Sequence, residues 1–391
     1  MKIKISLPFV LLLLTIWPFQ CWAKPIDQTA SVGFAVSVAD HYLAQHDADA
    51  LSWDWGDGVF LYGLAKLANV APAAYRARYT NYIREYHNRY SRPDSIDFLP
   101  IINRSDRCPS ALSAVRVYLD SGVESGLSNA LHVANYIKTE SRNRLGALNH
   151  LGSKNILNFF YPDSIWVDSL AMYDIFAAQW ARLSNDKTLM DFASAQHIIF
   201  SEKLQDPGTG LFRHAWFVKR EHSVPTTPVY WLRGNGWVAA SLVDVLDEVP
   251  LDHQNRNKLI QILQKQIAGL VKFQDRNGLW DTVINYTKPH YFETSGTALF
   301  AYAIAKGVRK GYLKSEYLGA AIKAYQGVRQ QLRWERDGYS MGGISGHTNP
   351  TDESGYARIG QHKDTNYGVG AYMLMAAEIA ELEVKNKGVN F

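Results

Sequence analysis

Residues 291–307 read YFETSGTALFAYAIAKG, and residues 365–381 read TNYGVGAYMLMAAEIAE. Both segments are apolar on every side and rich in small residues, which is typical of helices that are buried all round. Residues 72–90, PAAYRARYTNYIREYHNRY, instead carry many charges, as expected of a helix with a face in water. This alternation of charged and apolar segments predicts helices in pairs, with the apolar member inside.

Apolar periodicity predicts twelve helices, which form six such pairs. They are expected at about residues 31–46 and 54–69, 73–89 and 98–120, 124–139 and 165–185, 187–203 and 230–247, 252–274 and 291–311, and 314–333 and 366–384. The inner members start at irregular intervals of 44 to 75 residues, which fits a closed ring of helical hairpins better than an open solenoid. We therefore predict an all-α fold, an (α/α)6 barrel, formed by one domain over residues 24–391.

The predicted connections are long on one side of the ring and short on the other. Long loops enter the inner helices, at residues 140–164, 204–229, 275–290 and 334–365, whereas the turns that leave them are short. Long loops with glycine, aromatic and polar residues are where sites are usually built, and helix N-termini present free backbone N–H groups. We therefore expect the active face at the N-terminal ends of the inner helices.

The first 23 residues, MKIKISLPFVLLLLTIWPFQCWA, combine lysines, a short apolar run and a small residue at Ala23. This pattern predicts a secretory signal peptide, cleaved between Ala23 and Lys24, and an exported protein, periplasmic or secreted. An uncleaved anchor remains open. No later stretch is apolar enough to span a membrane.

Composition narrows the classes of function. Cleavage would remove Lys2 and Lys4, so the 41 basic residues become 39 against 37 acidic residues, and no basic block indicates a nucleic-acid surface. Cys108 would be the only remaining cysteine, which excludes an intrachain disulfide and argues against cysteine-based zinc chemistry. Neither HxH nor HExxH occurs, so we expect no metal and no cofactor.

Candidate functional residues cluster at or just before the starts of the inner helices. They are Trp55 in WDWGDG, Asp97 in SIDFLP, Asp168 in IWVDSLAM, His214 in GLFRHAW, Trp231, Arg233 and Trp237 in WLRGNGW, and Thr294 and Ser295 in YFETSGT. Flat aromatic faces stack on sugar rings, and an arginine can bind a uronate carboxylate with two hydrogen bonds. Together these residues indicate a carbohydrate site.

Each of these residues also has a structural interpretation. Asp168 could stabilise the positive end of a helix, and the tryptophans could fill the core. Arg233 could cap a neighbouring helix, and His214 could be a simple hydrogen-bonding residue.

Six motifs resemble glycoside hydrolase family 105, the unsaturated rhamnogalacturonyl hydrolases, and more distantly the unsaturated glucuronyl hydrolases of family 88. These motifs are WDWGDGVFLYGL, IWVDSLAM, GLFRHAW, WLRGNGW, NGLW and YFETSGTALFAYAIAKGVRKG, and they span essentially the whole chain after residue 23. The resemblance implies an (α/α)6 barrel without a cofactor. It also implies removal of a 4,5-unsaturated uronic acid from the non-reducing end of lyase-generated oligosaccharides, by hydration of the enol ether.

The same resemblance implies roles for single residues. Asp168 matches the general acid and base of the family, and Asp97 matches the second acid. Burial and a like-charged neighbour are expected to raise the pKa of the proton donor. The positions that match substrate contacts are His214, Trp231, Arg233 and Trp237, with Arg233 facing the uronate carboxylate, and Thr294 and Ser295 fall in a hydroxyl-rich segment.

Three segments depart from the family pattern, at 97–108 (DFLPIINRSDRC), 145–155 (LGALNHLGSKN) and 342–360 (GGISGHTNPTDESGYARIG). They leave open the second acid and the sugar that follows the uronate. Two other functions stay possible on the residues alone. One is an ordinary inverting glycosidase or lyase on the same barrel, and the other is an exported glycan-binding protein without activity. The oligomeric state is open.

Overall fold

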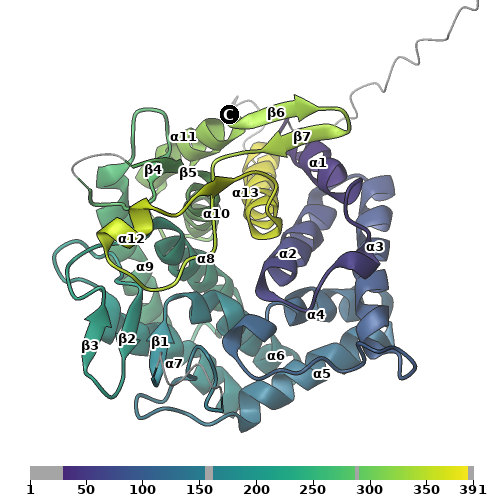
Figure 1. Cartoon of the computed structure of the whole chain (residues 1–391), viewed down its shortest axis with the longest axis horizontal. Coiled ribbons are helices and arrows are strands. Elements are labelled where there is room, and N and C mark those ends of the chain that lie inside the picture. The colour runs from purple at the N-terminus through teal and green to yellow at the C-terminus, as the bar shows by residue number, and fades with distance from the viewer. Residues whose placement is uncertain (1–29, 155–161, 287–289, 386–391) are drawn as a thin grey trace, which may run out of the picture.

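The computed structural model describes residues 30–154, 162–286 and 290–385. Thirteen α-helices occur among these residues (Figure 1). They are α1 (Ala30–Leu43), α2 (Trp55–Val70), α3 (Ala73–Ser91), α4 (Ser110–Ser121), α5 (Glu124–Thr139), α6 (Ile175–Leu183), α7 (Lys187–Leu204), α8 (Leu232–Glu248), α9 (Arg256–Leu270), α10 (Thr294–Arg309), α11 (Leu318–Arg329), α12 (Glu353–Ala357) and α13 (Asn366–Lys385). The first 23 residues, where we predict the signal peptide, lie outside the described residues.

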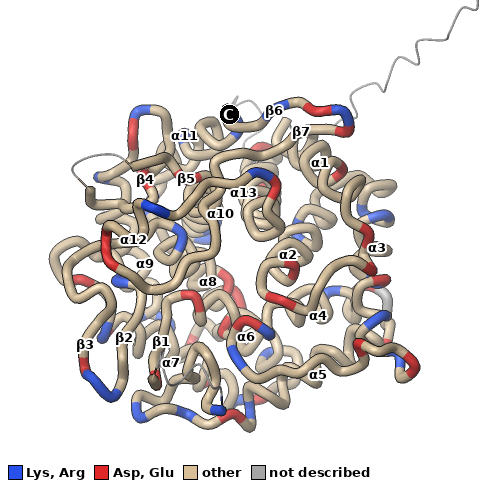
Figure 2. The backbone as a smooth tube through the Cα atoms, in the orientation of Figure 1, with Lys and Arg blue, Asp and Glu red and all other residues tan. Residues whose placement is uncertain are grey.

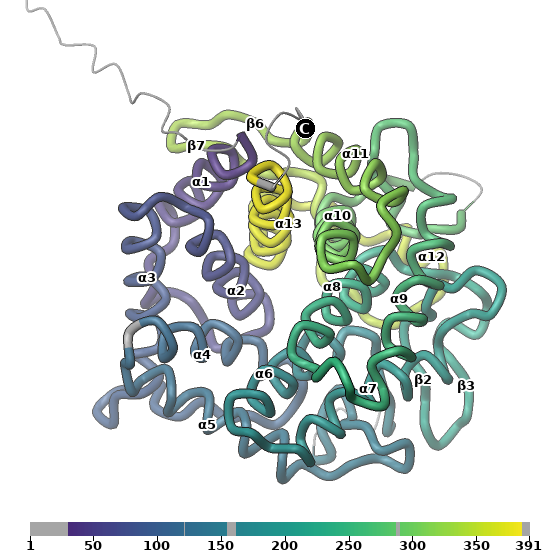
Figure 3. The backbone as a smooth tube through the Cα atoms, turned by 180° about the vertical axis from the view of Figure 1, so that it is seen from behind, coloured from purple at the N-terminus to yellow at the C-terminus, as the bar shows by residue number. Residues whose placement is uncertain are grey.

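Six helices form a closed inner ring. Contacts run from α2 through α4, α6, α8 and α10 to α13, and α13 packs back on α2. The helices α1, α3, α5, α7, α9 and α11 lie outside this ring, as the views from the two ends show (Figures 1 and 3). The predicted all-α (α/α)6 barrel is therefore confirmed, and the short α12 is an addition that periodicity did not indicate.

The ring closes where the first inner helix meets the last. Gly63 of α2 and Gly370 of α13 lie face to face, and a Cβ on Gly63 would come within 2.4 Å of the Gly370 carbonyl oxygen. Only a residue without a side chain allows the two backbones to approach this closely. The inner helices are buried because each packs against two inner neighbours and an outer helix, which explains their all-round apolar composition.

Acidic and basic positions are interspersed around the outside of the ring (Figure 2). Within the described ranges, no helix combines the length and the apolar character that crossing a membrane requires.

Two predicted helices begin later than expected. The segment predicted as helix 98–120 is a loop up to Pro109, and α4 begins at Ser110. The segment predicted to start at residue 165 begins with strand β1 (Ser164–Trp166), and helical turns begin at Asp168. Leu170–Asp174 has π-helical hydrogen bonding and continues into α6. In both cases long-range contacts determine the conformation of the loop before the inner helix.

Short antiparallel strands organise the long loops. β1, β2 (Ala215–Phe217) and β3 (His222–Val224) form one sheet, in which Ile165 faces Trp216. Three hairpin-like pairs follow: β4 (Trp280–Asp281) with β5 (Phe292–Glu293), β6 (Leu332–Glu335) with β7 (Gly338–Met341), and β8 (Ile344–Ser345) with β9 (Gln361–His362). The first sheet matters most for the site, because it brings the segments around Asp168 and His214 together.

Candidate active site

A pocket of about 240 Å³ opens at the N-terminal ends of the inner helices, on the face that the loop lengths predict. It is lined by Asp54, Trp55, Arg104, Asp106, His150, Trp166, Asp168, Met172, Trp231, Arg233, His347, Thr348 and Asn349. Four of the nine residues predicted for the site line it, namely Trp55, Asp168, Trp231 and Arg233.

Asp168 is held between two regular elements, β1 before it and the π-helical turn after it. The neighbouring Val167 N–H donates to the His214 carbonyl (2.9 Å), which extends the β1–β2 pairing by one residue. The Asp168 side chain is 14% exposed, and its Oδ2 lies 2.9 Å from Nε2 of the buried His214. The sheet therefore fixes the carboxylate and the imidazole as a pair, although His214 does not itself line the pocket.

The pKa of Asp168 lies below its ordinary value. Burial alone would raise it, but the charge and hydrogen bond of His214 and the nearby His150 lower it. This contradicts our expectation of a raised pKa, because the expectation considered burial and like charge but not a hydrogen-bond donor. Asp168 is therefore ionised in the free site.

Asp106 supplies the second carboxyl group. It lies on the loop before α4, with Oδ1 3.4 Å from Nε2 of His150 and Oδ2 3.6 Å from Nε of Arg104. Burial raises the pKa of Asp106, and Asp168 and Asp54 raise it further, against the effects of His150 and Arg104. The two acids thus have pKa values displaced in opposite directions, which is typical of paired catalytic carboxyls.

Asp97, which we predicted as the second acid, does not line the pocket. It lies on the loop after α3, where its Oδ2 pairs with Nε of Arg89 at 2.7 Å, beside the fully exposed Ile96. The prediction placed the start of the inner helix at residue 98. Because α4 begins at Ser110, the acid near its N-terminus is Asp106.

A glycine contact brings Asp106 to His150. Gly152 has a φ of +76°, and a Cβ there would come within 1.9 Å of the Asn103 carbonyl oxygen. Two residues away on each segment, the Ser105 N–H donates to the His150 carbonyl (3.0 Å). His150 belongs to LGALNH, a segment that we noted as different from the family pattern, so its role was missed in the sequence.

Arg233 makes protein contacts that the sequence did not predict. Its buried Nη1 and Nη2 donate to the carbonyls of Ser345 and Gly346, at 2.5 and 2.7 Å, and its guanidinium lies over the rings of Trp231 and Tyr367. These bonds hold the segment after β8 against α8. Arg233 touches the pocket, but its terminal nitrogens already have acceptors.

Arg104 is the second guanidinium that lines the pocket. Its Nε forms an ion pair with Oδ2 of Asp106 at 3.6 Å, which is too long for a hydrogen bond, and no acceptor among the described residues hydrogen-bonds its nitrogens. Its terminal nitrogens are therefore available to an anionic ligand.

Three other predicted residues are buried away from the pocket. Trp237 is core, and its ring meets Trp55 edge to face. Thr294 donates through Oγ1 to the Gly342 carbonyl (2.8 Å), and Ser295 donates through Oγ to Glu293, the residue that caps α10. The hydroxyl-rich segment thus supports the loop that borders the pocket.

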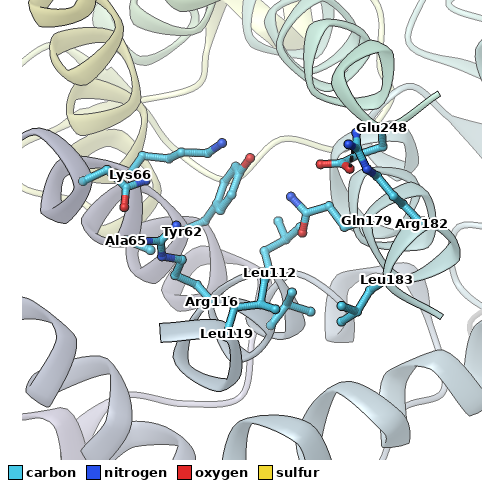
Figure 4. Close-up of a pocket in the computed structure, with 12 residues that line it drawn as sticks. Tyr62, Ala65, Lys66, Leu112, Arg116, Leu119, Gln179, Arg182, Leu183 and Glu248 are labelled. Carbon is cyan, nitrogen blue, oxygen red and sulfur yellow. Dashed lines mark ion pairs between the residues drawn. The ribbon is translucent and has the colours of Figure 1, made fainter. Parts of the chain in front are cut away.

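A second cavity, of about 480 Å³, lies between the C-terminal halves of α2, α4 and α6 and the end of α8 (Figure 4). Lys66, Tyr62 and Gln179 point toward its centre, and its one carboxylate, Glu248, pairs with Arg182 at 3.6 Å. It has no pair of acids and no tryptophan in its wall. The chemistry that a glycosidase needs is therefore at the other end of the barrel. In the described residues, no group of three or more His, Cys, Asp or Glu side chains is placed to hold a metal ion.

The sequence profile of Glycosyl Hydrolase Family 88 matches residues 33–383, almost the whole barrel. The chain belongs to this family. The family 88 chain is 24% identical to the unsaturated rhamnogalacturonyl hydrolase YesR of Bacillus subtilis, over 88% of this chain and 94% of that protein. It is 24% identical to an unsaturated 3S-rhamnoglycuronyl hydrolase of Alteromonas, over 55% of this chain and 50% of that protein.

The fold of this family 88 chain is also that of a solved relative. The crystal structure of a family 105 glycoside hydrolase from C. acetobutylicum superposes with a TM-score of 0.78 at 23% identity, over 89% of this chain and 99% of that one. The family resemblance that the motifs indicated is thus confirmed, and the chain is a glycoside hydrolase.

Proposed function

We propose that this protein removes a 4,5-unsaturated uronic acid from the non-reducing end of oligosaccharides made by polysaccharide lyases. The observation that carries the proposal is the pair of carboxyls, Asp106 and Asp168, which line one small pocket and have pKa values displaced in opposite directions. Membership of family 88 and the likeness to YesR support the same reaction. A pocket of about 240 Å³ suits one terminal sugar ring better than the middle of a chain.

Asp168 is the group that exchanges protons with the substrate. In the free site Asp106 binds a proton more readily than Asp168, because their pKa values are displaced in opposite directions. The unsaturated uronate brings a further carboxylate, and this added negative charge raises the pKa of both Asp106 and Asp168. Asp168 then carries a proton to C4 of the substrate, and the C4=C5 double bond supplies the electron pair for the new C–H bond.

Water completes the reaction at C5. It attacks the cation left at C5, and its proton passes to the Asp168 carboxylate, which restores the acid. The ring oxygen then leaves C5, which becomes a ketone, and the hemiacetal at C1 releases the next sugar. One water is consumed, and no bond to the enzyme forms.

The walls of the pocket supply recognition. Arg104 is proposed to bind the uronate carboxylate, because its terminal nitrogens have no protein acceptor. Trp55, Trp166 and Trp231 offer aromatic faces to the sugar ring. His347, Thr348 and Asn349 lie on the segment after β8 and are proposed to contact the next sugar.

The site of action is also a proposal. The first 23 residues support export by a cleaved signal peptide, and the balanced charge of the remaining chain supports a role without nucleic acid or stable membrane binding. Lyase products outside the cytoplasm are then the available substrates.

The test is a panel of unsaturated disaccharides. Residues 24–391 are incubated with lyase products from rhamnogalacturonan, ulvan and glycosaminoglycans, and loss of the ultraviolet absorbance of the conjugated enoate is followed. We expect at least one disaccharide to lose this absorbance and to release its second sugar. Cleavage of saturated oligosaccharides instead would indicate an ordinary glycosidase, and binding without turnover would indicate a glycan-binding protein.

Three carboxyl variants separate the roles of the acids. Asp168→Asn and Asp106→Asn should each lower kcat by at least about 100-fold, the usual scale of acid–base catalysis. Asp97→Asn is the matched control, because its carboxylate pairs with Arg89 at the surface, and it should keep wild-type kcat. An inactive Asp97→Asn with an active Asp106→Asn would reverse the assignment.

A further inference from the structure

The buried hydroxyl of Tyr356 reaches the catalytic pair through His214. Tyr356 lies on α12, in the segment 342–360 that differs from the family pattern. Its oxygen is 2.9 Å from Nδ1 of His214, and the Thr351 N–H donates to the same oxygen at 3.3 Å. Its ring is parallel to that of Trp231, with an interplanar angle of 1°.

The hydrogen count fixes the direction of these bonds. The Tyr356 oxygen accepts from Thr351, and in the described part of the chain its own hydrogen has one acceptor within reach, Nδ1 of His214. The ionised Asp168 carboxylate can only accept, so Nε2 of His214 bears a hydrogen and donates to Oδ2 at 2.9 Å. A neutral imidazole carries one hydrogen, so Nδ1 is bare and accepts from the Tyr356 hydroxyl. Burial lowers the pKa of His214 below its ordinary value, although Asp168 opposes this effect, so the ring is neutral at neutral pH and above.

We propose that Tyr356 is a positioning residue that keeps the mobile proton of Asp168 on Oδ1. Since Nε2–H of His214 occupies Oδ2, an incoming proton binds the other oxygen. Without the tyrosine hydroxyl, His214 could move its hydrogen to Nδ1 and accept a proton from Oδ2 of Asp168. That proton would be held between two protein groups and lost to the reaction. The role at C4 rests on the proposed function, whereas the tautomer of His214 does not.

The charged groups around Asp168 come from several elements. They are Asp106 and Arg104 before α4, His150 after α5, His214 at β2, Arg233 on α8, and Asp54 and His347 at the pocket wall. None of them changes in Tyr356→Phe. A change in the pH profile of this variant therefore reports the lost hydroxyl and not a lost charge.

The experiment compares Tyr356→Phe with wild type. Phenylalanine keeps the ring on Trp231, so the fold is retained. We expect kcat to fall about tenfold, the effect of one lost hydrogen bond, with KM nearly unchanged. The apparent pKa of the Asp106–Asp168 pair should move upward, because the new Oδ2–H to Nε2 bond favours protonated Asp168.

A spectroscopic readout tests the tautomer directly. In protein labelled with ¹⁵N-histidine, the His214 signals, assigned with His214→Gln, should show a protonated Nε2 and a bare Nδ1 at neutral pH. Tyr291→Phe is the matched control, because it removes a hydroxyl that bonds the same loop at Ser345 (2.9 Å) but does not touch His214. It should leave the tautomer and the pH profile unchanged.

Each result decides the proposal. A protonated Nδ1 in the wild-type protein would overturn it, as would an unchanged kcat and pH profile in an active Tyr356→Phe. If no disaccharide is hydrolysed by the wild type, the proposed function fails, but the ¹⁵N signals still decide whether Tyr356 sets the tautomer of His214.

Discussion

Arg233→Lys distinguishes an arginine that anchors a loop from one that binds substrate. In the structure the two terminal nitrogens of Arg233 donate to the carbonyls of Ser345 and Gly346. A lysine keeps the charge but can bond only one of these acceptors with good geometry. One charge-assisted hydrogen bond contributes about 1.5–3 kcal/mol, and stacking of a buried cation on aromatic rings about 0.5–2 kcal/mol. We expect the free energy of unfolding to fall by about 3 kcal/mol.

The matched variant is Arg104→Gln. This side chain is 27% exposed, and its contact with Asp106 is a 3.6 Å ion pair without a hydrogen bond, so its loss should change the free energy of unfolding by less than about 1 kcal/mol. Loss of a two-bond contact with the substrate carboxylate, worth about 1.5–3 kcal/mol, should instead raise KM about 10- to 100-fold. The methyl ester of the same substrate has no carboxylate, so the wild type and Arg104→Gln should hydrolyse it equally poorly.

The assays are urea unfolding followed by circular dichroism and steady-state kinetics on one unsaturated disaccharide. Arg233→Lys should lose stability, and Arg104→Gln should lose affinity for the acid but not for the ester. The reasoning is refuted if Arg233→Lys unfolds like wild type and alone loses discrimination between acid and ester. Arg233 would then bind the carboxylate, as its motif first indicated.

Three further variants test structural contacts, one beside the pocket and two elsewhere in the barrel. Gly152→Ala should lower kcat/KM about tenfold or more, because the added Cβ displaces the loop that carries Asp106. Steady-state kinetics and a crystal structure of the variant check this prediction. An undisturbed loop in that structure would contradict it. Lys306→Met should lower the free energy of unfolding by about 3–5 kcal/mol, since Asp244 would be left buried with a charge and no cation, and urea unfolding measures the loss. Burial raises the pKa of Asp174 to about 6, so the folded state binds more protons than the unfolded state between about pH 4 and 6. The free energy of unfolding of the wild type should therefore fall by about 3 kcal/mol relative to that of Asp174→Asn as pH rises through this window. Parallel plots of the free energy of unfolding against pH for the two proteins would refute this prediction.

The fold could be predicted because the alternation of apolar and charged helices follows from the whole ring and not from any single contact. Six helices that each touch two inner neighbours and an outer one must be apolar all round, and close approaches such as Gly63 against Gly370 require small residues. The outer helices keep a face in water and keep their charges. Both signals are visible without knowing any contact.

The second acid could not be predicted in the same way. Phe98, Leu99 and Ile101 have the spacing of a helix face, yet in the structure they are exposed on a loop. What places Asp106 in the pocket is the crossing of its loop with the segment at Gly152. That contact joins residues about fifty positions apart, and no local pattern encodes it.

The protein contacts of Arg233 could not be predicted for a similar reason, and they separate two parts of the site. Its type and place were predicted, but its acceptors lie on a segment more than 110 residues later. That segment supplies His347, Thr348 and Asn349 to the pocket, whereas Asp168 is fixed by β1 and the π-helical turn. The proton chemistry and the contacts to the next sugar therefore reside on different elements. Tyr356 is also on the later segment. Replacement of residues 342–360 by the matching segment of a relative should therefore alter both the choice of sugar and the pH profile. Replacement of residues 347–349 alone should alter only the choice of sugar.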